Sequence, residues 1–78
     1  MIIKKLSELK PGEAGVIVDP HGSGWMRKRM LDMGVTKSAP VVFKKSAPLG
    51  DPIEVNLRGY ELSLRKSEAD LVDVEVKA

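Results

Sequence analysis

The 78-residue chain contains no cysteine and only one histidine, His21. Without cysteine, neither a disulfide framework nor a thiolate metal site can form. Ferrous iron in oxygen chemistry typically takes two histidines and a carboxylate, and one histidine cannot supply that set within a monomer. We therefore expect no metal site within a monomer and no bound cofactor.

The motifs of catalysis are also absent. His21 lies in a loop between Pro20 and Gly22, where no cysteine can pair with it, and no serine stands in a G-x-S-x-G elbow. The segment HGSGW places two glycines before a helical stretch but lacks the lysine and the spacing of a P-loop. The sequence therefore predicts a protein that is not an enzyme.

Long apolar runs and a strong charge excess are missing as well. No run approaches the roughly 20 residues that cross a bilayer, and the opening MIIKKLSELKPGE lacks the apolar stretch of a signal peptide. Thirteen basic and eleven acidic residues leave a net charge of +2, which gives no general attraction to nucleic acid. We expect a cytoplasmic protein without membrane insertion or a nucleic-acid partner.

What the chain does contain is a series of short segments with a period of two. A β-branched segment covers residues 15–19, and a second begins at residues 41–43. Apolar and polar residues then alternate over 53–57, 60–64 and 72–76, which is typical of strands with one buried face. About five short strands in one domain, residues 1–78, favour a small, strongly bent SH3-like β-barrel, because a barrel leaves few open edges.

The connections between these segments carry turn signals. Arg58 and Gly59 alone separate two strands, which predicts a tight hairpin. Residues 47–52 form a loop with a proline near each end, and residues 67–70 suit a short helical turn before the last strand. Leu6 and Leu9, three residues apart, are consistent with one further helical turn.

One α-helix is predicted over residues 23–33, inserted between the first and second of these strands. Ser23 is a suitable N-cap and Gly34 a suitable residue to end the helix. Met26, Met30 and Met33 recur at helical spacing with Trp25 and Leu31 beside them, which indicates core packing rather than a soft-metal site.

Three pieces of the chain resemble the FeoA family. They are LSELKPGEAGVIV, RKRMLDMGVT and APLGDPIEVNLRGYELSLRKSEADLV, and their order and spacing are demanded by no general rule of folding. The resemblance covers the chain from end to end. It implies an SH3-like fold and an accessory role in ferrous-iron uptake, by contact with the FeoB-like membrane transporter and with modulation of its GTPase domain as one mode of action. Transition-metal binding is a term attached to the family, and a site shared across a dimer stays open.

Six residues are the candidates for partner binding: Trp25, Arg27, Arg29, Leu49, Arg58 and Tyr60. Tryptophan, tyrosine and arginine dominate the energetics of interfaces when they become buried there. Trp25 is either an exposed anchor or a core residue, since large apolar residues at this helix start depart from the family pattern. Leu49 is either a cap on the barrel or an exposed contact, and Tyr60, like Phe43, is expected to be at least partly buried.

Two other functions fit the same residues. One is a regulatory SH3-like module akin to the C-terminal domain of metal-dependent repressors, although nothing precedes Met1 here, which favours a free-standing protein. The other is an RNA-binding barrel, which would use the basic residues around Arg27 and Arg29 and would bind less at high salt. The oligomeric state, monomer or weak homodimer, is not fixed by the sequence.

Overall fold

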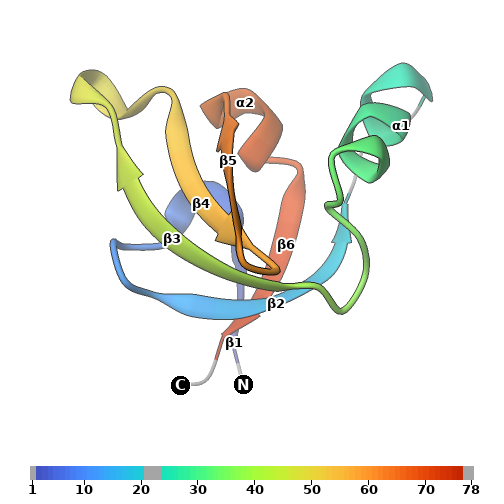
Figure 1. Ribbon diagram of the computed structural model, residues 1–78, viewed down its shortest axis with the longest axis horizontal. Helices are drawn as coiled ribbons and strands as arrows, with labels where there is room; N and C mark the ends of the chain where they lie inside the picture. The colour runs from blue at the N-terminus through green and yellow to red at the C-terminus, as the bar shows by residue number, and fades with distance from the viewer. Residues whose placement is uncertain (1, 21–23, 77–78) are drawn as a thin grey trace.

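The computed structural model describes residues 2–20 and 24–76. Its elements follow one another in the order β1 (Ile2–Lys5), η1 (Leu6–Glu8), β2 (Ala14–Pro20), α1 (Gly24–Asp32), β3 (Pro40–Ser46), η2 (Pro48–Gly50), β4 (Ile53–Leu57), β5 (Tyr60–Leu64), α2 (Lys66–Ala69) and β6 (Val72–Val76). The strands form one antiparallel sheet in the order β1-β6-β2-β3-β4-β5 (Figure 1). The prediction of a mainly β chain with one inserted helix and a short helix before the last strand is confirmed.

The sheet is strongly bent. Its register shifts between Ile17 and Asp19 in β2 and between Phe43 and Lys45 in β3, and such bulges bend and twist a strand. As a result β2 and β3 curve along the lower side of the view, and β4, β5 and β6 extend upward from them (Figure 1). The bending lets six short strands enclose one core.

The sixth strand was not predicted. β1 has the sequence IIKK, in which apolar and charged residues do not alternate, and both Ile2 and Ile3 are largely exposed. β1 is an edge strand that pairs only with β6, so pairing rather than burial defines it. The helical turn expected at Leu6 and Leu9 is confirmed as η1, and both leucines are buried.

The core comes from the inward residues of the alternating strands. β4 and β6 alternate strictly between buried and half-buried positions, as their sequences predicted. In β5 only Leu64 is fully buried, and Tyr60 keeps 44% of its surface exposed because β5 is the other edge strand. Phe43 is buried, as expected.

One close approach depends on a glycine. Gly15 lies in β2 where β6 passes directly over it, and a Cβ at this position would come within 2.5 Å of the Glu75 carbonyl oxygen. That distance is well below van der Waals contact, so only glycine fits without moving a strand.

The helix α1 rests on the core through its methionines. Met30 is fully buried, and Met26 and Met33 pack against the core at its edge, which confirms their assignment to packing. Leu31, which lies beside the methionine stripe, keeps 42% of its surface exposed. His21 and Ser23, the predicted loop histidine and N-cap, lie outside the described residues. No helix in the part of the chain that the structure describes is long and apolar enough to span a bilayer.

Candidate partner-binding surface

Trp25 lies on the outer side of α1 and is 70% exposed. At about 100° per residue, the five positions between Trp25 and the buried Met30 turn the tryptophan about 140° away from it, whereas Met26 stays on the inner side. Trp25 therefore faces away from the core and is not a core residue.

Two arginines on α1 have different environments. Arg27 lies 3.5 Å from the Asp19 carboxylate, and both side chains are about half exposed. Arg29 donates from Nε to Glu68 Oε2 at 2.9 Å, and the Glu68 side chain is only 6% exposed. The Arg29 pair therefore joins α1 to α2 through a buried carboxylate and a half-exposed guanidinium, whereas both partners of the Arg27 pair are about half exposed.

Glu68 is a residue that the sequence analysis missed. Its second carboxylate oxygen, Oε1, accepts the Arg65 backbone N–H at 2.9 Å, so both oxygens are engaged. A glutamate three residues after the start of a helix can reach back to the first N–H in this way. That spacing of Arg65 and Glu68 was the available signal.

The β4–β5 hairpin packs against the end of α1. Leu57 pairs with Tyr60 across the predicted two-residue loop, and the Tyr60 hydroxyl donates to the Met33 carbonyl. Arg58 donates from Nη2 to Thr36 Oγ1 at 2.8 Å. Arg58 and Tyr60 therefore lie beside the segment that follows α1.

Five of the six predicted residues thus gather around α1, and we call them the α1 surface: Trp25, Arg27, Arg29, Arg58 and Tyr60. Leu49 does not join them. It lies in η2 at the opposite end of the sheet (Figure 1), with a left-handed φ of 72° and a fully exposed side chain. Leu49 is therefore an exposed residue rather than a cap on the barrel.

A cleft of about 330 Å³ opens next to the α1 surface. Arg29 lines it from α1, Ser63 and Arg65 from the end of β5, and Glu68 from α2. Asp51 completes the polar lining, and its Oδ1 accepts the Lys66 backbone N–H at 2.9 Å. The sequence analysis named only Arg29 among these residues, because the cleft brings together four separate segments.

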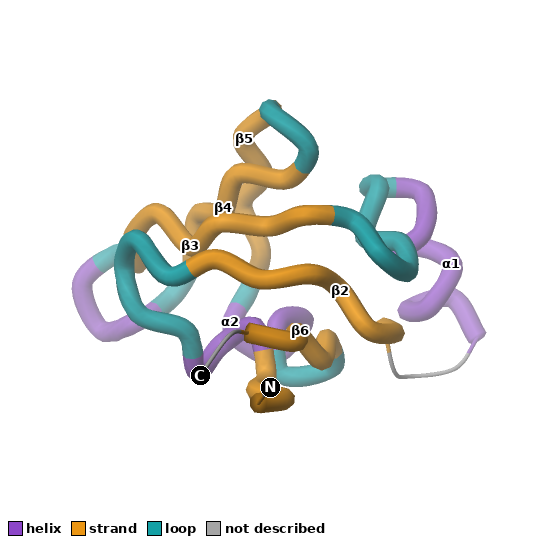
Figure 2. Tube along the Cα trace, turned by 90° about the horizontal axis from the view of Figure 1, so that it is seen from below, coloured by secondary structure: helices purple, strands orange, loops and turns teal. Residues whose placement is uncertain are grey.

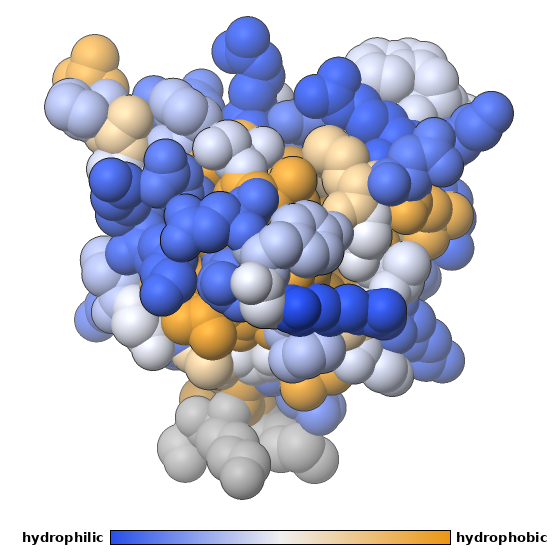
Figure 3. Space-filling model, viewed as in Figure 1, coloured by the Kyte–Doolittle hydropathy of each residue, from blue (hydrophilic) through white to orange (hydrophobic). Residues whose placement is uncertain are grey.

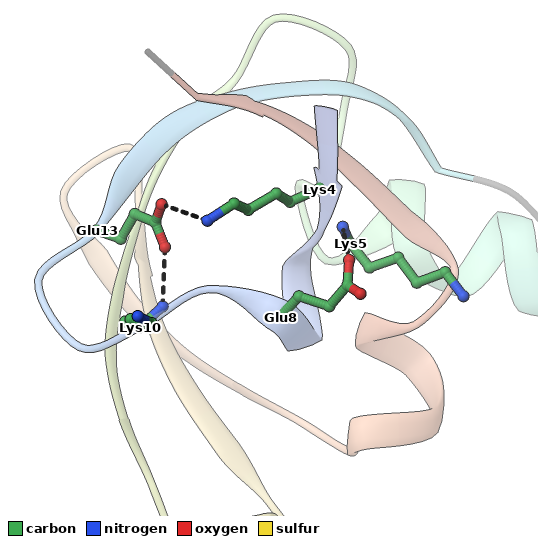
Figure 4. Close-up of polar contacts among 5 residues, drawn as sticks. All are labelled: Lys4, Lys5, Glu8, Lys10 and Glu13. Atoms are coloured by element: carbon green, nitrogen blue, oxygen red, sulfur yellow. Dashed lines mark hydrogen bonds and ion pairs between the residues drawn. The ribbon is translucent and has the colours of Figure 1, made fainter. Parts of the chain in front are cut away.

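A second polar cluster lies at the other end of the molecule. Glu13 accepts from Lys4 Nζ at 3.1 Å and from the Lys10 backbone N–H at 3.0 Å (Figure 4). The Lys10 hydrogen bond, followed by the Lys4 contact, holds the pKa of Glu13 below its ordinary value of 4.5. Glu8 accepts the Lys5 N–H at 2.8 Å in the same region. These contacts fasten β1 to the turn before β2.

Among residues 2–20 and 24–76, no three histidine, aspartate or glutamate side chains are grouped so that they could share a metal ion.

Comparison with known proteins gives a consistent family. The model of the FeoA domain matches residues 4–76. A fusion of Fe(2+) transport protein A with the Fe(2+) transporter FeoB, from Porphyromonas gingivalis, is 39% identical over 72 residues, which are 92% of this chain and 8% of the fusion protein. The chain thus spans only a small part of that relative's length.

Solved structures agree with this assignment. A FeoA-like protein from Clostridium acetobutylicum is 36% identical, with a TM-score of 0.88 over 97% of this chain and 88% of that one. FeoA from Stenotrophomonas maltophilia, described as a prokaryotic SH3 domain protein complexed with zinc, is 26% identical, with a TM-score of 0.77 over 96% of this chain and 91% of that one. The SH3-like fold expected from the strand pattern is confirmed.

The same fold occurs in a regulator of transcription. A manganese-dependent transcriptional repressor superposes with a TM-score of 0.88 at 14% identity, covering 99% of this chain and 38% of the repressor. At that identity the likeness concerns the fold alone.

Proposed function

Because the chain belongs to the FeoA family, we propose that it is a cytosolic accessory protein of bacterial ferrous-iron uptake that acts by direct contact with a FeoB-like transporter. The family is one of non-enzymatic accessory proteins. The proposal therefore assigns this chain a binding role and leaves chemistry and iron movement to the transporter.

The observation that carries the proposal is the fusion protein of Porphyromonas gingivalis, in which one chain contains both a FeoA part and a FeoB transporter. A linker between two modules raises their effective concentration to the millimolar range when it is short and flexible. A fusion is useful when the two parts act on each other, so it supports contact between the corresponding separate proteins.

The α1 surface is the part of the molecule that we assign to this contact. Trp25 offers a large side chain that is already exposed, and burying an aromatic ring of this size is a strong source of binding free energy. Arg27 supplies positive charge on the helix, and Arg58 supplies it beside the segment that follows the helix. An acidic surface with an apolar pocket is the complementary shape on the transporter.

The test is a titration of the protein against a FeoB-like transporter in membranes, with and without GTP. We expect saturable binding, and the Trp25→Ala variant should bind about tenfold or more weakly, because a central aromatic anchor is worth 2 kcal/mol or more. Dependence of the affinity on GTP would place the effect on the GTP-binding domain. Absence of binding in every nucleotide state would contradict the proposal.

Leu49→Ser is the matched control, since Leu49 is also an exposed apolar residue but lies at the other end of the sheet. A contact confined to the α1 surface leaves the affinity of Leu49→Ser unchanged. A loss equal to that of Trp25→Ala would show that the contact extends to η2.

The two ion pairs also indicate which arginine should be replaced by glutamate. Arg27→Glu alters a solvent-exposed pair, whereas Arg29→Glu would set a second carboxylate beside the buried Glu68. The second change would destabilise the fold and confuse a binding assay. Arg27→Glu is therefore the informative variant, and we expect it to weaken binding while lowering the unfolding midpoint far less than Arg29→Glu does.

A further inference from the structure

Strand β5 has one free edge. It is the last strand in the sheet and pairs only with β4 among the residues that the structure describes. Seen from below, β5 stands apart from the rest of the sheet (Figure 2). A free edge presents backbone N–H and C=O groups that can pair with another strand.

The hairpin register identifies these groups. In an antiparallel hairpin with a two-residue loop, the residues beside the loop form a hydrogen-bonded pair, and such pairs recur at every second residue. Tyr60, Leu62 and Leu64 therefore bond to β4, opposite Leu57, Val55 and Ile53. The N–H and C=O groups of Glu61 and Ser63 point away from β4, and both residues are exposed.

The helix α1 lies across from the free edge of β5. The Tyr60 hydroxyl joins one end of β5 to the Met33 carbonyl, and Arg29 lines the cleft at the other end together with Ser63. The space-filling view shows apolar surface exposed between the positions of β5 and α1 (Figure 3). Leu62 of β5 and Met33, the residue after α1, are both partly buried against the core. The free edge therefore borders a groove rather than open solvent.

In the cleft, the carboxylates have hydrogen-bond partners, whereas the guanidinium groups keep unused donors. The Glu68 carboxylate is engaged by Arg29 Nε and by the Arg65 N–H, and Asp51 accepts the Lys66 N–H. Within the described residues, the Arg65 side chain forms no ion pair, and the Arg29 guanidinium uses only Nε in its pair with Glu68. Guanidinium groups match the geometry of a carboxylate, so the cleft can accept one more.

We propose that the groove between β5 and α1 binds an extended, acidic peptide segment of a partner protein. The segment adds to β5 as a further strand, pairing with the backbone of Glu61 and Ser63, and places one carboxylate side chain in the cleft at Arg29 and Arg65. This is the mode in which main-chain bonds give affinity and a side-chain pocket gives specificity. Glu61 determines which position of the peptide can be acidic, because an acidic side chain opposite Glu61 would be repelled.

This site is distinct from the anchor at Trp25 and does not depend on which protein supplies the segment. The probe is a library of random heptapeptides displayed on phage, selected against the wild-type protein. We expect the enriched peptides to share one aspartate or glutamate among residues of high strand propensity. No enrichment, or enriched peptides without a carboxylate, would overturn the proposal.

Hydrogen exchange of a selected peptide complex tests the geometry. The amides of Glu61 and Ser63, which point away from β4, should exchange at least tenfold more slowly on binding, and the Leu62 amide, already bonded to β4, should change little. Protection elsewhere with no change at Glu61 and Ser63 would refute strand addition.

Two variants separate the backbone and charge contributions. Ser63→Pro removes the outward N–H without removing a bond to β4, a position where an edge strand tolerates proline, and it should abolish peptide binding. Arg65→Gln should weaken binding of the acidic peptide about tenfold, since charge-assisted hydrogen bonds are worth about 1.5–3 kcal/mol. The same Arg65→Gln variant should bind a peptide in which glutamine replaces the acidic residue with unchanged affinity.

Lys44→Gln is the matched control, because Lys44 is an exposed cation outside the cleft. An equal effect of Lys44→Gln and Arg65→Gln would reduce the interaction to general charge attraction and overturn the proposal. A second copy of the chain could occupy the β5 edge instead of a peptide, and sedimentation of the free protein tests this. A dimer that forms in the wild type and is lost in Ser63→Pro would show that a second copy binds there and would overturn the proposal.

Discussion

Tyr60 and Gly34 show how a single contact joins two parts of the chain. The Tyr60 hydroxyl reaches the Met33 carbonyl just before Gly34, which has a φ of 91°. A Cβ at Gly34 would lie 2.2 Å from that hydroxyl oxygen, so the glycine leaves the space that the tyrosine fills. Gly34 therefore allows both the backbone turn after α1 and the close packing of the hairpin against it.

Gly34→Ala should destabilise the protein more than Gly12→Ala. Gly12 has a similar φ of 87° but no atom within 4 Å of its Cβ position, so this control carries only the backbone strain of about 1 kcal/mol. The clash with Tyr60 should add about 1–3 kcal/mol at Gly34, measured by urea unfolding. In a Tyr60→Phe background the additional loss should shrink, and equal losses for the two alanine variants would contradict the steric explanation.

Among the elements, β1 depends on polar contacts more than on burial. Its isoleucines are largely exposed, and it is fastened by pairing with β6 and by the Lys4–Glu13 pair. The Ser7 hydroxyl also donates to the Asp70 carboxylate, which links η1 to the turn after α2. An edge strand of four residues is therefore held by charge and backbone bonds.

The Glu13 contacts should make this fastening sensitive to acid. The folded pKa of Glu13 lies below its ordinary value of 4.5, so its ionised form stabilises the folded state. That contribution is complete above pH 4.5 and is lost as the pH falls from there through the lowered pKa. The free energy of unfolding of wild type minus that of Glu13→Gln should therefore be constant above this range and shrink below it. A difference that does not change with pH would contradict the assignment.

At the scale of the whole molecule, α1 is an appendage held to the barrel at a few points. They include the methionines that pack on the core, the Tyr60–Met33 hydrogen bond and the Arg29–Glu68 pair. This arrangement leaves most of the helix surface exposed for contact with other molecules while fixing the position of Trp25. The β5–α1 groove lies between the Tyr60–Met33 hydrogen bond and the cleft that Arg29 and Ser63 line.

The Arg29–Glu68 pair should contribute more to stability than the Arg27–Asp19 pair on the same helix. Arg29→Gln leaves a buried carboxylate without its cation and should cost about 1–2 kcal/mol, between the values of exposed and fully buried pairs. Arg27→Gln should cost about 0.5 kcal/mol or less, because both partners are about half exposed. Thermal and urea unfolding measure the two losses, and equal values would show that burial of Glu68 does not strengthen its pair.

The strands that alternate were predictable because burial on one face leaves a period of two in the sequence. That pattern identified β4, β5 and β6, and the hairpin loop at Arg58 and Gly59 followed from its length. β1 was not predicted, because it pairs through backbone groups, which every residue has and which leave no pattern in the sequence. Leu31 is exposed because a helix on the rim of a barrel buries only a narrow stripe.

The candidate site divides in the same way. The sequence by itself determined the types of residue available for binding, the helix that carries Trp25, Arg27 and Arg29, and the lack of cysteine ligands, since these depend on composition and local spacing. Only the tertiary structure decided that Trp25 is exposed, that Leu49 lies apart, and that Arg29 meets Glu68 from a segment 39 positions away. The physical reason is that local spacing fixes periodicity, whereas the burial of a charge and the walls of a groove arise only when distant segments pack together.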